Sequence, residues 1–317
     1  MEIILEMKNV QISFPYGQQK IQVVRGLDLT VGRGEILGIL GETGSGKSVS
    51  SAAILGLIRD EDGSIDEGSI FYDGKDISQY QERELRKLRG KDISCIFQNP
   101  VEALNPYLTV GTQIMEMLKI HGEGGHKETV LKSLVEVGLD NASTIYHMYP
   151  FQLSGGQCQR VMIAMAVICK PRLLIADEPT SSIDASLRSK ILSLLAEINT
   201  RYGTAIIVIT HDFGVVRSIC HRIIVMYGGL MMEEGRTEEV LSNALHPYTR
   251  QLIRCANSFT DKTKRLYSLA GSAPSPLDYG EECPFYTRCS QKKDACRQAV
   301  PAMQEIFPGR KVRCLRL

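Results

Sequence analysis

The stretch GETGSGKS, residues 41–48, constrains this chain most, because it matches the phosphate-binding pattern G-x-x-x-x-G-K-[ST]. An apolar run over residues 36–40 precedes it and a helix-compatible run over residues 49–57 follows, which is the strand, loop and helix order that the pattern requires. Glycines let backbone N–H groups turn toward a phosphate, and the helix N-terminus adds positive potential. The residues predicted to bind the nucleotide here are Gly41, Glu42, Thr43, Gly44, Ser45, Gly46, Lys47, Ser48 and Val49.

Within this loop, two side chains have specific expected roles. Lys47 would reach the β- and γ-phosphates, and the Ser48 hydroxyl would bind Mg²⁺. A glycine-rich turn that matches by accident is the alternative, and the strand and helix on either side disfavour it. The sequence therefore predicts a nucleotide-binding protein.

Length and charge limit the remaining function classes. A chain of 317 residues suggests two domains, or one large domain with an appendage. The 37 basic and 36 acidic residues give a net charge of +1, unlike the strongly basic balance of a nucleic-acid-binding domain. The sequence contains no run of 18 apolar residues, and its acidic N-terminus lacks a signal-peptide pattern. We therefore expect a cytosolic protein that does not span a membrane.

The N-terminal part of the chain has the alternation of an antiparallel sheet. Apolar and polar side chains alternate over residues 3–31, with turn sequences at 15–17 (PYG) and 32–34 (GRG). Phe14 and Tyr16 stand upstream of the phosphate loop, where an aromatic ring can stack on an adenine. An ordinary strand aromatic is the alternative, and position alone favours neither.

Acidic residues follow a predicted buried strand in the run RLLIADE, residues 172–178. The carboxyl ends of parallel strands are where α/β sheets carry their chemistry. We expect Asp177 to hold the Mg²⁺ water shell and Glu178 to orient and deprotonate an attacking water. Solvated acids at a strand end are the alternative, which a chain with a phosphate loop disfavours.

Two more polar residues follow predicted strands. Gln98 comes after the strand over residues 93–97, where it could bind Mg²⁺ or hold a water, although a solvated loop glutamine is the default interpretation. His211 follows the strand over residues 205–210. A lone histidine is usually structural, but at this strand end it could hydrogen-bond the γ-phosphate and position the water.

The middle of the chain changes to helical periodicity. Residues 109–140 read as helices inserted into an α/β chain. Ser154 then stands as an N-cap with Gly155 and Gly156 in the first turn of an apolar helix that ends before Pro171. Such an exposed helix N-terminus is a second potential anion site. A capped core helix is the alternative, and this stretch alone favours it.

The chain changes again after about residue 236. Strands predicted over residues 222–227 and 230–234 close the α/β part. Two helices follow, separated at Pro247, and then a linker over residues 270–282 that is rich in proline, glycine and serine.

Nine cysteines are many for a reducing compartment, where thiols and metal ligands are more common than disulfides. Five of them, in predicted strands and helices, are explained as buried thiols. The other four have the spacing C-x5-C-x6-C-x17-C, unlike the C-x2-C pairs of ordinary zinc sites. An iron–sulfur cluster, zinc and free thiols all remain open for these four. They are Cys283, Cys289, Cys296 and Cys314.

In order and spacing, six stretches of residues 3–236 resemble the motifs of ABC-type ATPases. Four of these motifs are the phosphate loop, Gln98 as the Q-loop, residues 173–178 as Walker B and His211 as the H-loop. The other two motifs are the signature Leu153-Ser154-Gly155-Gly156-Gln157 and the D-loop Ser181-Ser182-Ile183-Asp184. The sequence departs from the family pattern at Ile183, where leucine is usual, and at Cys158 after the signature, and neither departure removes a chemical group.

This resemblance implies an α/β fold of the P-loop ABC-type ATPase class. An N-terminal antiparallel β subdomain, a helical insert over about residues 99–165 and a small cysteine-bearing C-terminal extension would complete it. The ATPase domain would span residues 1–236 and the extension residues 237–317.

The resemblance also implies a mechanism that uses ATP and Mg²⁺. Two ATPase subunits would face each other head to tail, so that ATP held by Lys47 and Ser48 of one is closed over by Ser154 and Gly156 of the other. Glu178 would activate water and His211 would stabilise the transferring group. Phe14 matches the adenine-stacking aromatic, and the predicted magnesium ligands are Ser48, Gln98 and Asp177.

Three further stretches, IFQNPVEALNPYLTVG, HPYTRQLI and CPFYTRC, resemble ATP-binding subunits of the dipeptide, oligopeptide and nickel importer branch. That branch implies a second, often non-identical ATPase subunit, two membrane permeases gripped by the helical insert, an extracytoplasmic substrate-binding protein and no nucleic acid. The chain would be peripheral at the cytoplasmic face of the inner membrane. The resemblance to cysteine-bearing members favours a [4Fe-4S] cluster. Import of nickel or a metal chelate, and a soluble regulatory ABC protein, are the alternatives.

Overall fold

The computed structural model describes residues 2–122, 124–181, 185–260 and 267–315, and its contacts divide the chain into two compact units. The signature unit comprises residues 1–4, 32–36 and 80–209. The phosphate-loop unit comprises residues 5–31, 37–79 and 210–317. Of the predicted D-loop, residues 182–184 lie outside the described residues.

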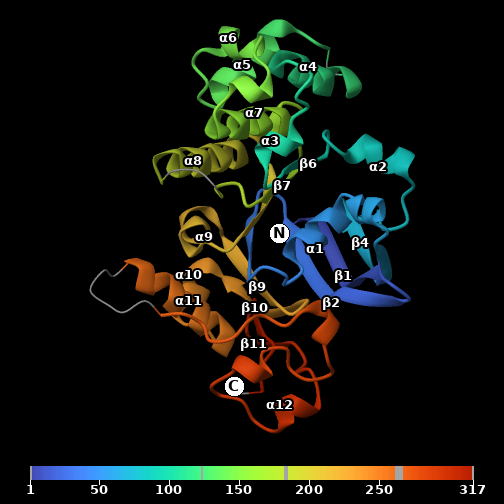
Figure 1. Ribbon diagram of the computed structural model, residues 1–317, viewed down its shortest axis with the longest axis vertical. Helices are drawn as coiled ribbons and strands as arrows, with labels where there is room; N and C mark the ends of the chain where they lie inside the picture. Colours follow the sequence, from blue (N-terminus) through green and yellow to red (C-terminus); the bar gives the residue numbers. More distant parts are fainter. Residues whose placement is uncertain (1, 123, 182–184, 261–266, 316–317) are drawn as a thin grey trace. The chain divides into compact units, whose positions relative to one another are not determined.

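The signature unit is built on three parallel strands in the order β6-β7-β8. The apolar residues of β7 and β8 are fully buried, as expected of parallel strands covered on both faces. Helices α4 and α5 pack against α7, and α6 packs against α4 and α5, in the green part of Figure 1. The elements are α2 Glu82–Leu88, β6 Ile93–Ile96, α3 Pro100–Ala103, α4 Val110–Ile120, α5 Lys127–Glu136, α6 Ala142–Tyr146, the 3₁₀ helix Pro150–Gln152, α7 Gly155–Val167, β7 Leu173–Asp177, α8 Ala185–Tyr202 and β8 Ala205–Thr210.

The phosphate-loop unit contains two groups of strands. One has the order β2-β1-β4-β5 with antiparallel pairs, as the alternating N-terminal sequence predicts. The other has the order β3-β9-β10-β12-β11, in which only β3 and β9 pair in parallel. The strands are β1 Ile3–Tyr16, β2 Gln19–Gly32, β3 Ile36–Leu40, β4 Ser64–Tyr72, β5 Lys75–Asp76, β9 Arg222–Tyr227, β10 Leu230–Arg236, β11 Gln304–Phe307 and β12 Arg310–Val312.

One helix of the phosphate-loop unit, α1, comes directly after the phosphate loop, and its other α-helices lie after residue 210. The strand, loop and helix order around the phosphate loop is confirmed, since β3 ends at Leu40 and α1 begins at Lys47. The predicted break at Pro247 is also confirmed, because this proline begins α11. The helices are α1 Lys47–Ile54, α9 Phe213–Ile219, α10 Thr237–Ser242, α11 Pro247–Thr260 and α12 Ala295–Gln298, with 3₁₀ helices at Leu57–Glu61, Pro276–Asp278 and Tyr286–Arg288.

One prediction about the end of the sheet is wrong. The strands over residues 222–234 do not close it, because β12 pairs antiparallel with β10 and β11 pairs with β12. A buried ion pair reinforces this pairing: Arg310 donates to Glu233 of β10 at 2.9 Å, and the two side chains are 6% and 0% exposed. A buried charge is costly unless an opposite charge lies beside it, and Arg310 of β12 supplies that charge to Glu233. The C-terminal strand β12 is therefore part of this unit's core.

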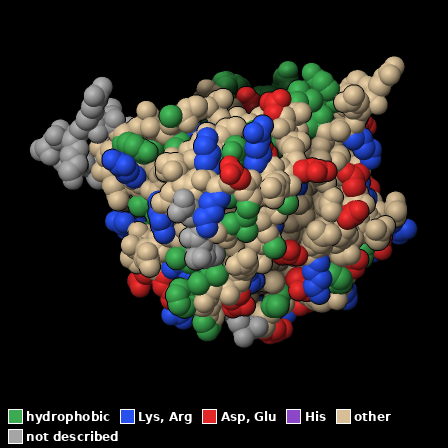
Figure 2. Space-filling view, turned by 90° about the horizontal axis from the view of Figure 1, so that it is seen from below, with side chains coloured by type: hydrophobic (Ala, Val, Ile, Leu, Met, Phe, Trp, Pro, Cys, Tyr) green, Lys and Arg blue, Asp and Glu red, His purple; other side chains and the backbone are tan. Residues whose placement is uncertain are grey.

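The surface and the helices agree with the bulk properties of the sequence. Figure 2 shows Lys and Arg side chains interspersed with Asp and Glu on the face in view. Within the part of the chain that the structure describes, no helix combines the length and apolar character needed to cross a bilayer.

Candidate functional site

The phosphate loop connects β3 to α1 in a conformation that depends on its glycines. Gly44 and Gly46 have φ values of +82° and +97°, in the left-handed region that side chains rarely adopt. A Cβ at Gly41 would lie 2.3 Å from the Met226 backbone oxygen, so the loop passes too close to β9 for any side chain there. The sequence therefore forms a tight loop at the N-terminus of an eight-residue helix.

Two polar side chains of the loop have the chemistry that a phosphate requires. Lys47 is buried, and its ammonium donates to the Gly41 and Glu42 carbonyls at 2.8 and 2.9 Å. The Ser45 hydroxyl oxygen is also buried, and it has no hydrogen-bond partner among the described residues. Because a buried hydroxyl without a partner costs free energy, a phosphate oxygen would satisfy it. These two residues fit the predicted nucleotide, and Ser48 stands exposed beside them as a potential magnesium ligand.

Other predicted residues of the phosphate-loop unit lie at strand ends. Phe14 is half-buried near the end of β1, and its ring would clash with a Cβ added at Gly63. Tyr16 is 58% exposed. His211 is exposed directly after β8, and Asp212 caps α9 by accepting from the Gly214 backbone N–H at 2.7 Å. This cap at Asp212 fixes the direction of the chain immediately after His211.

In the signature unit, the predicted carboxylates lie at the end of β7. Asp177 ends the strand and is half-buried, and Glu178 follows with a φ of +49°. A non-glycine residue in this region carries backbone strain, which is common at functional sites. The Glu178 N–H donates to the Ile209 carbonyl of β8 at 2.9 Å, which fixes this strained residue against the strand. Gln98 is exposed two residues beyond β6.

The signature helix has the predicted cap. Ser154 accepts from the Gln157 N–H, and the Gln157 side chain accepts from the Ser154 N–H at 2.9 Å, which forms a capping box. A Cβ added at Gly155 would meet no atom within 4 Å, whereas one at Gly156 would lie 2.4 Å from Leu187. Ser154 and Gly155 are exposed. The N-terminus of α7 therefore presents backbone N–H donors on an open surface.

Of the predicted D-loop, the structure describes Ser181, whose hydroxyl donates to the Glu178 carbonyl.

Sequence analysis missed three residues that contact the phosphate loop from the C-terminal part of the chain. Arg288 forms an ion pair with Glu42 at 2.8 Å, and Tyr279 donates to the Gly44 carbonyl at 3.3 Å. The Tyr248 hydroxyl accepts from the Glu42 N–H at 3.0 Å. Burial lowers the pKa of Arg288, but its hydrogen bonds to Glu42 and Tyr227 outweigh burial and raise it overall. The stretches HPYTRQLI and CPFYTRC, noticed only for their resemblance, contain two of these residues.

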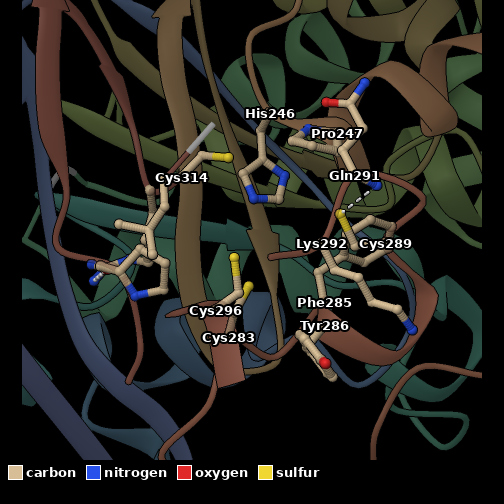
Figure 3. Close-up of a pocket in the computed structure, with 13 residues that line it drawn as sticks. His246, Pro247, Cys283, Phe285, Tyr286, Cys289, Gln291, Lys292, Cys296 and Cys314 are labelled. Carbon is tan, nitrogen blue, oxygen red and sulfur yellow. Dashed lines mark hydrogen bonds between the residues drawn. The ribbon is translucent and has the colours of Figure 1, made fainter. Parts of the chain in front are cut away.

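The four C-terminal cysteines line one small cavity of about 20 Å³, together with His246. In the view of Figure 3, the His246 ring lies between Cys314 and Cys289, with Cys283 and Cys296 below it. Burial raises the pKa of the Cys283 thiol to about 11, and the three neighbouring thiols act in the same direction. Burial also lowers the pKa of His246 to about 3, so its ring is neutral.

Four thiols around one cavity have the donor chemistry of a soft metal centre. Their arrangement is different, because no group of three or more His, Cys, Asp or Glu side chains among the described residues is arranged to hold a metal ion. The structure therefore brings the predicted cysteines together without giving them a coordination geometry.

Comparison with known sequences identifies two families along the chain. Residues 24–181 match the family described as ABC transporter, and residues 232–296 match the family described as Oligopeptide/dipeptide transporter, C-terminal region. The chain is 40% identical over 315 residues to the dipeptide transport ATP-binding protein DppD of Escherichia coli (strain K12), covering 98% of this chain and 96% of DppD. It is 38% identical over 317 residues to the oligopeptide transport ATP-binding protein AppD of Bacillus subtilis (strain 168), covering 99% and 97%.

Solved structures agree with the sequence families. The ATP-binding cassette MJ0796, in a dimeric post-hydrolysis state bound to ADP and phosphate, matches with a TM-score of 0.67 and 30% identity over 74% of this chain and 98% of that one. CbiO1 of Clostridium perfringens, part of the transporter complex cbiONQ, matches with a TM-score of 0.64 and 27% identity over 77% and 92%. This chain is an ABC-type ATPase, and it belongs to the ABC transporter ATP-binding proteins that carry the oligopeptide/dipeptide transporter C-terminal region.

Proposed function

We propose that this chain is the ATP-hydrolysing subunit that energises a membrane importer of dipeptides or oligopeptides. The observation that carries the proposal is the pairing, in one chain, of a phosphate loop with a free buried hydroxyl and a C-terminal region of the oligopeptide/dipeptide transporter family. Relatives named for dipeptide and oligopeptide transport match along almost the full length of the chain, which supports the same role here.

The nucleotide site that we propose uses the residues that the sequence motifs assign to it. Lys47, Ser45 and the loop N–H groups would bind the phosphates, and Phe14 would stack on the adenine. Mg²⁺, held by Ser48, Gln98 and Asp177, would neutralise charge on the phosphates. Glu178 would accept a proton from the attacking water, and His211 would donate a hydrogen bond to the γ-phosphate. The remaining nucleotide contacts would come from Gly41, Glu42, Thr43, Gly44, Gly46 and Val49.

Hydrolysis would require a second ATPase subunit, identical or not. The capped and exposed N-terminus of α7 suits this role, since its donors point to an open surface. Ser154, Gly155, Gly156 and Gln157 of one subunit would close over the ATP that its partner holds.

Two permease subunits would bind the helical insert, about residues 99–165. Large apolar side chains are exposed on and beside it, and water-exposed aromatic residues of this size mark protein interfaces. Gln98, at the root of the insert, would link nucleotide binding to this surface. The chain would then lie peripherally at the cytoplasmic face of the membrane, and an extracytoplasmic binding protein would deliver the substrate. The exposed residues are Phe97, Val101, Tyr107, Ile120, Val135, Tyr149 and Phe151.

The division of the chain follows from this assignment. We propose an ATPase domain over residues 1–236 and a C-terminal extension over residues 237–317. The pairing of β12 with β10 means that the extension is anchored in the sheet of the ATPase domain.

The test compares the full chain with its Glu178→Gln variant. We expect ATP hydrolysis to fall by about a hundredfold or more, with ATP binding retained, because the amide cannot accept the proton. Glu197→Gln, an exposed position on α8, is the matched control and should hydrolyse ATP normally. A Glu178→Gln variant with normal hydrolysis would contradict the catalytic assignment.

Uptake in cells that carry either variant in place of the native protein then identifies the cargo. Loss of labelled dipeptide or oligopeptide uptake with Glu178→Gln supports the proposal. Loss of nickel uptake alone supports the metal-importer alternative. If the native chain hydrolyses ATP but Glu178→Gln changes no uptake, the result supports a soluble regulatory ABC protein.

We also propose that Cys283, Cys289, Cys296 and Cys314 hold a metal centre, of which a [4Fe-4S] cluster is the favoured form. Support comes from the shared cavity, although the thiols must move to reach a common metal. Anaerobic purification with iron, sulfide and zinc analysis tests this against a Cys283→Ser/Cys289→Ser variant. About four irons per chain, lost in the variant, would support a cluster. Zinc would support a structural metal site, and metal-free protein would contradict both.

A further inference from the structure

Three side chains from the C-terminal part of the chain hold the phosphate loop, two of them at peptide groups of the loop and one at the Glu42 carboxylate. Arg288 Nη1 donates to Glu42 Oε2 at 2.8 Å, and the two side chains are 7% and 26% exposed. The Tyr248 hydroxyl accepts from the Glu42 N–H at 3.0 Å. The Tyr279 hydroxyl donates to the Gly44 carbonyl at 3.3 Å. All these residues belong to the phosphate-loop unit.

The contact with Tyr248 acts on the same peptide group that Lys47 uses. A peptide group is planar, with its N–H and C=O on opposite sides. In the group that joins Gly41 to Glu42, the N–H donates to Tyr248 while the carbonyl accepts from the Lys47 ammonium. Tyr248 therefore fixes the orientation of the carbonyl that positions Lys47.

The Tyr279 contact has the same effect further along the loop, at the Gly44 carbonyl. Its hydroxyl holds the carbonyl of the peptide group that joins Gly44 to Ser45, and this directs the Ser45 N–H to the opposite side. That N–H donates to the Glu42 carbonyl at 3.2 Å, which closes the turn. The loop side chain with the buried, unsatisfied hydroxyl, Ser45, is thus oriented from outside the loop.

The groups that hold the loop are themselves rigid. Tyr227, Tyr248 and Phe285 are fully buried and pack ring against ring, with centroid distances of 4.5 to 5.3 Å. Arg288 also donates to the Tyr227 hydroxyl at 3.0 Å and, through Nε, to the Ala270 carbonyl at 2.9 Å. A guanidinium already held by the Tyr227 hydroxyl and the Ala270 carbonyl loses little further freedom when it binds Glu42.

We propose that Arg288, Tyr248 and Tyr279 are positioning residues of the phosphate loop, and that through them the C-terminal segment sets the affinity of this chain for ATP. The proposal rests on the nucleotide site proposed above and adds its regulation. Without these contacts the loop samples conformations in which Lys47 and Ser45 are misplaced, and the affinity falls by the fraction of time spent in them.

The test measures binding of a fluorescent N-methylanthraniloyl derivative of ATP to the full chain, in the variants Arg288→Gln, Glu42→Gln and the two combined. We expect each single variant to bind on the order of tenfold more weakly, the size typical of a charged hydrogen bond. The KM for ATP should rise by a similar factor while kcat changes by less than about twofold, because the loop acts in binding. The double variant should resemble the single ones, because Arg288 acts through Glu42.

Two controls separate this role from a structural one. Arg297→Gln removes the same charge from an exposed position of the same segment and should bind the nucleotide normally. Arg288→Lys keeps the charge and should recover part of the affinity. If Arg288→Gln does not fold, Tyr279→Phe tests the proposal in its place, because it keeps the ring and removes only the hydroxyl that donates to the Gly44 carbonyl.

The outcomes distinguish this inference from the proposed function. Nucleotide binding by the wild-type chain that is equally tight in Arg288→Gln or Glu42→Gln would overturn the inference alone. The inference would also be overturned if Arg288→Gln weakened nucleotide binding by its full factor in a chain that already carries Glu42→Gln. A wild-type chain that does not bind the ATP derivative at all would overturn the nucleotide site and the inference with it.

Discussion

The phosphate loop and the signature helix are both glycine-containing helix N-termini, yet the chain holds them in different ways. Side chains more than 200 residues away, from Tyr248 to Arg288, fix the loop, and its Lys47 is buried. The N-terminus of the signature helix is capped locally by Ser154 and Gln157, three residues apart, and Ser154 is exposed. A site shaped in advance suits a ligand that this chain binds itself, whereas an exposed, locally capped one suits a ligand brought by a partner.

The largest effect expected from this difference is that of Lys47→Ala. It removes the only ammonium inside the loop and the two hydrogen bonds that it donates to the loop carbonyls. We expect ATP to bind about a hundredfold more weakly or worse, from the loss of a charged contact with the phosphates. The measurement is titration with the fluorescent ATP derivative, with Lys20→Ala, which breaks an exposed ion pair with Asp66, as the control. Tight ATP binding by Lys47→Ala would contradict the role of the loop as a nucleotide site shaped in advance.

Alanine at matched glycines gives the next largest difference. Gly46 has a φ of +97°, and a Cβ there would lie 3.2 Å from the Val23 carbonyl, whereas Gly155 has open space. We expect Gly46→Ala to lower the free energy of unfolding by about 2 kcal/mol. Gly155→Ala should leave it unchanged or raise it by a few tenths of a kcal/mol, since alanine favours helix. Urea unfolding measures both, and equal losses would show that the two sites are equally constrained.

Ser154→Ala should have a smaller effect, confined to the signature helix. Loss of the cap is expected to cost about 1 kcal/mol in the free energy of unfolding. ATP binding by the isolated chain should stay unchanged, while hydrolysis falls, because this serine would contact the nucleotide of a partner subunit. Ser154→Thr keeps the hydroxyl and should retain stability. Weaker ATP binding by the isolated Ser154→Ala chain would contradict the division of roles.

The smallest expected effect is a pH dependence of stability that comes from Tyr279, which contacts the loop. Burial raises the pKa of Tyr279 to about 12, although nearby Arg25 lowers it. The folded-state pKa exceeds the usual value of about 10, so this stabilisation is complete below pH 10 and is lost as pH rises toward 12. Between pH 8 and 10.5, the wild type should lose slightly more unfolding free energy than Tyr279→Phe. An equal loss in both proteins would show that this tyrosine does not stabilise the loop.

Local signals in the sequence predicted much of each site. The glycine pattern located the loop, and the order Ser154-Gly155-Gly156-Gln157 predicted the capped helix, because both structures depend on residues within a few positions of one another. The strand ends that carry Asp177 and His211 were also predictable, since buried parallel strands read as continuous apolar runs.

The contacts of the C-terminal segment could not be predicted in this way. No periodicity or spacing pairs Arg288 with Glu42, because the fold alone brings them together. The pairing of β12 with β10 was missed for the same reason: three residues at 310–312 are too few to show strand alternation, and their partner lies about 80 residues earlier. Cysteine spacing likewise predicted a shared role without predicting the cavity that the four thiols line.

The ion pair between Arg310 and Glu233 has a consequence for the timing of synthesis. Glu233 is fully buried, and it accepts from the backbone N–H groups of Leu245 and His246 as well as from Arg310. A nascent chain that has not yet released residue 310 from the ribosome holds this carboxylate without its counter-ion. The phosphate-loop unit therefore forms this buried ion pair only after translation has passed β12.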